Sequence, residues 1–169
     1  MSDTIKTPEQ EAPKVNPVEA MKTLAHNYQV PMSDGTIQQI AESAKDSNVL
    51  PAFEEHMKTS AQGLYPTFAK QIAAGIPTAL LLDPYRQVAK RVLGEQFEPD
   101  FVGNTVHAKA LHGGMDPATG RPAPMGLDQW TEHLKTHPSF GWANTENGMA
   151  ARNDVLRTIH EAFTNGGMQ

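Results

Sequence analysis

Thirteen prolines and thirteen glycines, spread along 169 residues, constrain what this chain can fold into more than any other feature. Proline cannot continue a helix without losing a hydrogen bond, and glycine commonly ends helices, so the segments between them must be short. Inside these segments apolar residues recur at intervals of three and four, which is the spacing of one helical face. The sequence therefore predicts an all-α fold of about seven short helices joined by Pro- and Gly-rich loops.

Helix-start signals support this fold class. Asn16-Pro17 and Ser33-Asp34 are typical of an N-cap followed by the first helical turn. Asp83-Pro84 has the same form and predicts a helix that begins there and ends at Gly94. Residues 76–82 (IPTALLL) are the most apolar run, and we expect a helical turn there because no second β-like segment is present to pair with it.

The last helix is expected to begin near a capping residue, Thr145. It carries an apolar face formed by Val155, Leu156, Ile159, Ala162 and Phe163.

The expected domain organisation has three parts. Residues 1–16 form a flexible N-terminal arm, because they mix both charge signs with prolines and have little apolar surface to bury. Residues 17–165 form the helical domain, with a possible sub-boundary near residues 94–104, and residues 166–169 form a C-terminal tail. The first residues lack an apolar run, so no secretory signal is expected, and no run approaches the roughly 20 residues needed to span a bilayer.

Composition argues against several kinds of function. The chain has no cysteine, which excludes disulfides, thiolate metal sites and cysteine nucleophiles. The formal net charge is -5, whereas a protein dedicated to nucleic acid usually carries a basic excess, so nucleic acid is not expected as the primary ligand. One small basic patch, Arg86, Lys90 and Arg91, is the only candidate for a contact with phosphates.

Catalytic and metal-binding patterns are not convincing in this sequence. His133 and His137 are four residues apart, a spacing that can place two imidazoles on one helical face, but Pro138 ends the helix and no third ligand is evident. His107 and His112 flank a short helix without a nucleophile beside them. No phosphate-binding loop or nucleophile elbow is present. We expect no catalytic residues, no metal and no cofactor, and no small-molecule substrate.

The most informative region runs from a Pro-rich segment, residues 115–125 (MDPATGRPAPM), in which we expect a turn, to the second tryptophan. Its candidate partner-binding residues are Trp130, Phe140, Trp142, Pro122 and Pro124. One interpretation is a local core in which the aromatic rings pin loop to helix. The other is an exposed anchor, because aromatic residues dominate the binding energy of interfaces. The two uses can coexist.

Three segments carry a family resemblance over residues 83–148: DPYRQVAKRVLG, MDPATGRPAPMGLDQW and HPSFGWANTENG. In series they resemble small helical structural proteins associated with the virions of tailed bacteriophages. The resemblance implies a non-enzymatic structural or minor component of the virion that binds larger particle proteins (portal, tail or capsid) in a symmetric assembly. An internal or ejected protein is one form of that role. It also implies synthesis in the host cytoplasm.

Other functions remain open at this stage. The first is a transient assembly scaffold or chaperone, although scaffolds tend to be long-helical and rich in charge, and only 20% of these residues are charged. The second is an accessory module of a virion enzyme that degrades cell walls. An independent regulator directed at the host is the third.

Overall fold

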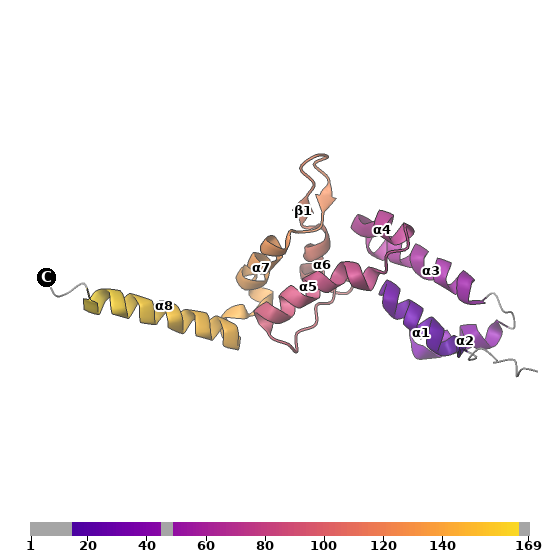
Figure 1. Cartoon of the computed structure of the whole chain (residues 1–169), viewed down its shortest axis with the longest axis horizontal. Helices are drawn as coiled ribbons and strands as arrows, with labels where there is room; N and C mark the ends of the chain where they lie inside the picture. Colours follow the sequence, from indigo (N-terminus) through magenta and orange to yellow (C-terminus); the bar gives the residue numbers. More distant parts are fainter. Residues whose placement is uncertain (1–14, 45–48, 166–169) are drawn as a thin grey trace, which may run out of the picture.

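The computed structural model describes residues 15–44 and 49–165, and it confirms the all-α fold class (Figure 1). Residues 1–14 of the predicted arm and residues 166–169 of the predicted tail lie outside the described residues. The α-helices are α1 (Pro17–Tyr28), α2 (Asp34–Ser43), α3 (Val49–Leu64), α4 (Ala69–Ala73), α5 (Thr78–Leu93), α6 (Thr105–His112), α7 (Leu127–Thr136) and α8 (Glu146–Asn165). Three short 3₁₀ helices accompany them: η1 (Pro66–Phe68), η2 (Pro138–Phe140) and η3 (Trp142–Asn144).

The first two predicted helix starts are confirmed by their capping hydrogen bonds. The side chain of Asn16 accepts a bond from the main-chain N–H of Val18 (3.0 Å), with Pro17 in the first helical position. Ser33 accepts in the same way from Thr36 (3.2 Å). Each cap satisfies one of the N–H groups that a helix leaves unpaired at its start.

The predicted start at Asp83-Pro84 is wrong, because α5 runs through it without interruption from Thr78. Residues 76–82 and the following helix therefore form one element, which ends at Gly94 as expected (φ 116°). Pro84 is exposed, so the carbonyl group that loses its helical partner can face water. Leu82 and Tyr85 on either side are buried, and their packing holds the helix together across the proline.

Helix α5 lies at the centre of the fold. It packs against α1 and against α7, while α1 also packs against α2 and α3, and α3 packs against α4 (Figure 1). The largest fully buried side chains come from nearly all of these helices: Met21, Ile37, Met57, Ile72, Thr78, Leu82, Trp130 and Leu134. The connection of residues 94–104 belongs to the same core, since its Phe101 is buried against the ring of Trp130 (centroids 6.3 Å apart).

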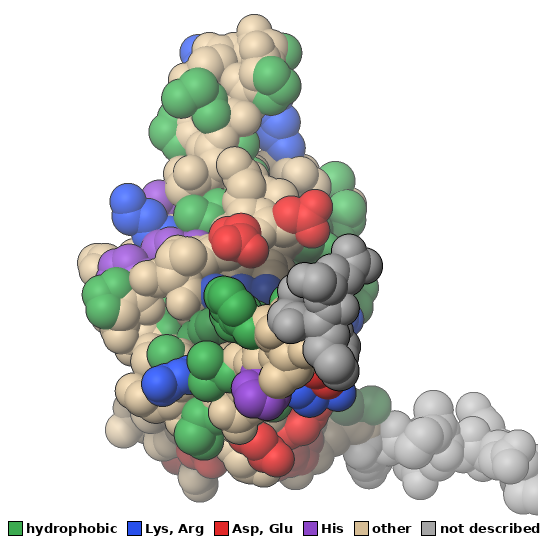
Figure 2. Space-filling model, turned by 90° about the vertical axis from the view of Figure 1, so that its left-hand side faces the viewer, with side chains coloured by type: hydrophobic (Ala, Val, Ile, Leu, Met, Phe, Trp, Pro, Cys, Tyr) green, Lys and Arg blue, Asp and Glu red, His purple; other side chains and the backbone are tan. Residues whose placement is uncertain are grey.

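The Pro-rich segment forms a hairpin, where the sequence predicted a turn without strands. Strands β1 (Gly114–Met115) and β2 (Pro122–Ala123) pair antiparallel, and two residues per strand are too few to give an alternating sequence pattern. Asp116 shapes the tip, where its carboxylate accepts bonds from the N–H of Ala118 (2.9 Å) and the hydroxyl of Thr119 (2.8 Å). The hairpin stands out from the body of the molecule (Figures 1 and 2).

Candidate protein-binding surfaces

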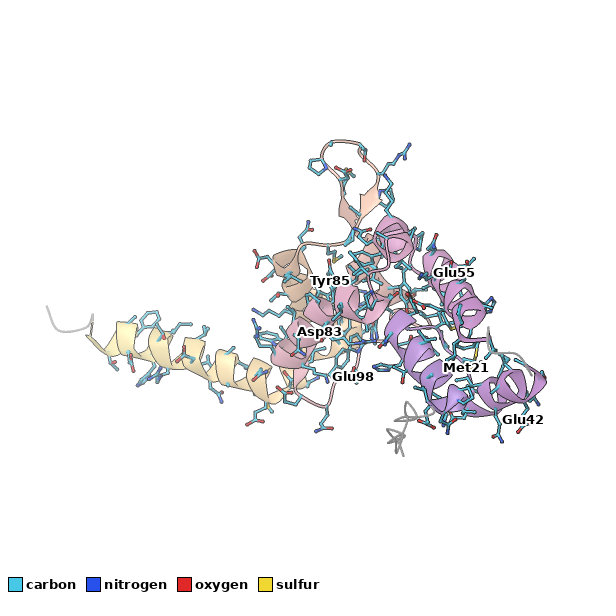
Figure 3. The ribbon with its side chains drawn as sticks, turned by 45° about the vertical axis from the view of Figure 1, so that its right-hand side comes forward. Met21, Glu42, Glu55, Asp83, Tyr85 and Glu98 are labelled. Atoms are coloured by element: carbon cyan, nitrogen blue, oxygen red, sulfur yellow. The ribbon has the colours of Figure 1, made fainter. Side chains whose placement is uncertain are left out.

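Trp130 lies in the core and not on the surface. Its side chain is fully buried, and its indole Nε1–H donates a hydrogen bond to the main-chain oxygen of Tyr85 on α5 (3.0 Å). The hydroxyl of Tyr85, whose side chain is labelled in Figure 3, donates in turn to the main-chain oxygen of Met125 (2.8 Å). These bonds join α5, α7 and the segment after the hairpin. In this fold Trp130 offers no surface to a partner, and the local-core interpretation describes it.

Phe140 is the hub of a half-buried cluster of rings. It stacks on His107 (5.2 Å between centroids) and meets Trp130 edge-on (5.8 Å). Edge contacts with His133 (5.6 Å), His137 (6.0 Å) and Phe97 (6.0 Å) complete the cluster. Such edge and stacked arrangements contribute beyond the burial of area alone. Phe140 therefore holds η2 against α6 and α7, which fixes the position from which η3 and α8 continue.

Each histidine of this cluster uses one ring nitrogen in a bond with the main chain. His133 Nε2 donates to the oxygen of Val106 (3.2 Å). The Nδ1 of His107 accepts from the N–H of Asp100 (2.9 Å), and the Nδ1 of His137 accepts from Ser139 (3.2 Å). Burial lowers the pKa of both His107 and His133, which favours their neutral forms.

The structure places the imidazoles of His133 and His137 with ring centroids 5.1 Å apart, as the sequence spacing predicted. Within residues 15–44 and 49–165, no group of three or more acidic or histidine side chains is arranged to hold a metal ion.

The basic patch on α5 is largely engaged with Glu98 of the following connection, whose position beside α5 is labelled in Figure 3. Lys90 forms an ion pair with Glu98, and Arg86 Nε lies 4.0 Å from the same carboxylate. The guanidinium of Arg86 also lies over the ring of Phe101, 6.0 Å from its centroid. A phosphate would have to compete with Glu98 for these two cations. Arg91 is exposed.

The two prolines proposed to bind partners lie in the hairpin and just after it. Pro122 is exposed in β2, and Pro124 is half-buried beyond it. The neighbouring Met115 in β1 is 73% exposed, which makes it one of the most exposed apolar side chains in the described part of the chain. The tip is held by the bonds of Asp116, so the hairpin is a preformed projection that a partner can contact without ordering it first.

Trp142 is half-buried at the base of α8. One side of its ring faces the ammonium of Lys135, 5.7 Å from the ring centroid. Its surroundings include a groove, called here the root groove, lined by η3 residues Trp142, Ala143 and Asn144 and by α8 residues Gly148, Ala151, Arg152, Val155 and Leu156. Most of these side chains are apolar, so the root groove is suited to an apolar side chain of a partner.

Helix α8 begins at a tightly built junction. Thr145 caps it as predicted, since its hydroxyl oxygen accepts a bond from the N–H of Gly148 (3.1 Å). The same hydroxyl donates to the main-chain oxygen of Trp142 (2.6 Å). Gly148 is buried directly against that oxygen, where a β-carbon would overlap it. Asn147 adds a bond from its side-chain amide to the main-chain oxygen of Arg91 (2.9 Å).

Beyond this junction α8 projects away from the body, and no other described element packs along it (Figures 1 and 3). From Met149 to Thr164 every side chain is exposed. Five large apolar side chains fall on one face of the helix, called here the α8 stripe: Met149 (50% exposed), Val155 (57%), Leu156 (54%), Ile159 (47%) and Phe163 (80%). Figure 2 looks at the molecule from the side on which α8 projects.

The sequence located this helix and its apolar residues, but it did not show that they face solvent. A core-facing helix has the same periodicity, so no local signal distinguishes the two cases. The combined apolar surface of the α8 stripe is on the order of 500 Å², which is at the upper end of what monomeric proteins leave uncovered.

No described helix is long and apolar enough to cross a membrane. Comparison with known proteins finds no family model, no curated protein and no solved structure that matches this chain.

Proposed function

We propose that this chain is a non-enzymatic, protein-binding component of a larger assembly, and that the assembly is the virion of a tailed bacteriophage. The uncovered α8 stripe is the observation that supports the protein-binding role. A helix of this length is marginally stable alone in water and gains most of its stability by packing its apolar face. No described element packs against this face, so we expect a partner to cover it.

The charges of α8 favour a protein partner over a membrane surface. Helices that lie on membranes carry a polar face rich in Lys and Arg. Along α8, Arg152 and Arg157 are outnumbered by Glu146, Asp154 and Glu161. Arg157 is moreover paired with Asp154. This polar face is therefore mixed and slightly acidic, which suits a solvated outer side of a protein complex.

The chemistry of the ring cluster favours a structural role over catalysis. His107, His133 and His137 each use a ring nitrogen in a main-chain bond, and the rings of all three contact Phe140. His107 and His137 accept through Nδ1, so in the neutral ring their proton is on Nε2 and no further lone pair is left to act as a general base. These histidines instead fix the position of the segment that leads to α8.

The second half of the proposal, the phage particle, is supported by the resemblance of residues 83–148. Those residues form α5, the hairpin, α7 and the junction of α8, which together present the two projecting elements. A small protein with two preformed projections can join neighbours in a symmetric particle. We propose the hairpin as the contact with a larger particle protein of the portal, tail or capsid.

Cross-linking mass spectrometry of purified particles tests this function. The proposal expects the chain in mature particles, with cross-links from Lys70 near the hairpin to a portal, tail or capsid protein. A chain abundant in infected cells but absent from particles would overturn the virion role, and the transient scaffold would then lead. A chain found in neither would overturn the phage context altogether.

A further inference from the structure

We infer that the α8 stripe is covered by the α8 stripe of a second copy of this chain, in an antiparallel pair in which Phe163 of each copy occupies the root groove of the other. This inference rests on the proposed function and names the occupant of its central surface.

Helix α8 carries both an exposed aromatic ring, Phe163, and the root groove that could receive such a ring. Phe163 is the most exposed large apolar side chain of the described residues, at 80%. It lies eleven residues after Arg152, which lines the root groove. Eleven residues span about 16 Å of helix. In an antiparallel pair whose two-fold axis passes between Arg157 and Thr158, Phe163 of each copy lies opposite Arg152 of the other. Both root grooves are then filled at once.

The charge of Arg152 decides the orientation. Arg152 lies within the α8 stripe, three residues after Met149 and four before Leu156, and it forms no ion pair with any described residue. In a parallel pair the two Arg152 side chains would face each other, which is unfavourable for like charges. In the antiparallel pair each guanidinium meets the ring of Phe163, and such a cation–π contact is favourable.

The remaining contacts follow from the same register. At the centre of the pair, Leu156 of each copy lies opposite Ile159 of the other. This arrangement is isologous, since the same patch serves both copies, as a two-fold axis requires. The acidic residues Asp154 and Glu161 lie on the opposite side of α8 and remain in water.

The area is sufficient for a specific dimer of modest affinity. Two stripes together offer on the order of 1,000 Å² of apolar surface, which reaches the lower limit of specific protein interfaces. The face of α8 opposite the stripe is polar, so a third or fourth helix would find no apolar surface to pack against. We therefore expect a dimer that forms reversibly with concentration.

Sedimentation equilibrium of the full chain tests the pairing, with two variants that introduce the same charge. Leu156→Glu places a carboxylate in the centre of the stripe, and Ala150→Glu places one on the opposite side of α8. We expect a monomer–dimer equilibrium for the parent chain and for Ala150→Glu, and at least a tenfold weaker association for Leu156→Glu. A parent chain that stays monomeric at several hundred micromolar, or a Leu156→Glu variant that associates like the parent, would overturn the inference.

Cysteine cross-linking tests the orientation against a clean background, because the chain has no cysteine of its own. Asn153 and His160 are exposed at the polar edge of the stripe, so replacing them leaves its apolar contacts intact. The antiparallel register brings Asn153→Cys of one copy beside His160→Cys of the other. Under oxidation we expect disulfide-linked dimers from the mixture and few from either variant alone. Strong cross-linking of Asn153→Cys to itself would contradict this register and overturn the arrangement.

The two proposals fail in different ways. A chain that is monomeric in solution but present in particles removes the self-pairing and leaves the virion role standing. A chain that is dimeric in solution but absent from particles removes the virion role and leaves the self-pairing standing.

Discussion

Gly148 packs so closely against Trp142 that any larger residue at position 148 would overlap the main-chain oxygen of Trp142. The hydroxyl of Thr145 bonds to both residues, accepting from Gly148 (3.1 Å) and donating to Trp142 (2.6 Å). Three residues thereby close the junction between η3 and α8 in a single conformation. The direction in which α8 leaves the body is set there, and with it the direction of the apolar stripe.

Replacement of Gly148 by alanine is therefore expected to disrupt the base of α8. The added β-carbon forces the main chain apart at a cost of roughly 1–3 kcal/mol. We expect trypsin to cleave after Arg152 and Arg157 several times faster than in the parent chain.

The matched control for this variant is Gly63→Ala in α3. A β-carbon at position 63 meets nothing within 4 Å. Alanine there is expected to stabilise the helix by about 0.5–1 kcal/mol, because it restricts the unfolded chain more than glycine does. Equal cleavage rates in Gly148→Ala and Gly63→Ala would contradict the account of the junction.

The two tryptophans are expected to respond differently to truncation. Trp130→Ala removes a fully buried ring and its bond to Tyr85, which we expect to cost about 3–5 kcal/mol of unfolding free energy. Trp142→Ala removes a half-buried ring, and we expect less than half that loss. Urea denaturation followed by circular dichroism measures both. Losses of equal size would contradict the assignment of Trp130 to the core and Trp142 to the root groove.

Stability should decline in mild acid because of the ring cluster. Burial lowers the pKa of His107 and His133 in the folded protein below the ordinary value of 6.5. As the pH falls below about 6.5, the unfolded chain therefore binds more protons than the folded one. The stability that these two groups contribute is complete above that pH and is lost as the pH falls towards their pKa in the folded protein. We expect a lower urea midpoint at pH 5 than at pH 7.5.

Substitution identifies the groups responsible for this pH dependence. In the double variant His107→Gln and His133→Gln neither side chain titrates, and the difference between the two pH values should shrink. A parent protein with the same urea midpoint at both pH values would refute this prediction, as would a double variant that keeps the full difference.

Thr78 is a buried polar residue in the first turn of α5 whose hydroxyl has no hydrogen-bond partner among the described residues. Valine has nearly the same shape without the hydroxyl. We expect Thr78→Val to raise the unfolding free energy by roughly 1 kcal/mol, because an unpaired buried hydroxyl is costly. If calorimetry instead shows that Thr78→Val destabilises as much as Thr78→Ala, the hydroxyl has a favourable partner.

Local signals made much of the fold predictable from the sequence. Asn16, Ser33 and Thr145 cap helices through bonds to residues two or three positions away, and Gly94 ends α5 by its own backbone conformation. Pro84 was misleading because the cost of a proline depends on whether the carbonyl it leaves unpaired reaches water. That depends on the packing of Leu82 and Tyr85 against other helices, which lies beyond the local sequence.

The candidate surface was harder to predict for a related reason. Helices α5 and α8 share the same spacing of apolar residues, but Val88 and Val92 are buried whereas Leu156 and Ile159 are exposed. The two helices differ in what packs against them: α1 and α7 cover α5, whereas beyond its junction with η3 no described element packs along α8. Trp130 and Trp142 differ similarly, because α7 turns one ring towards α5 while η3 leaves the other beside the root groove.

The most direct test of the central claim, that α8 is a binding element whose stripe is covered in the assembly, is amide hydrogen exchange of α8. It would be measured on the dilute free chain and on the chain within purified particles. In the dilute chain we expect the amides of residues 152–164 to exchange rapidly, since one isolated helix is held only at its base. In the assembly the same amides should become protected, with a stronger gain than in α5. Rapid exchange of α8 in both samples, or equal protection in both, would contradict the claim.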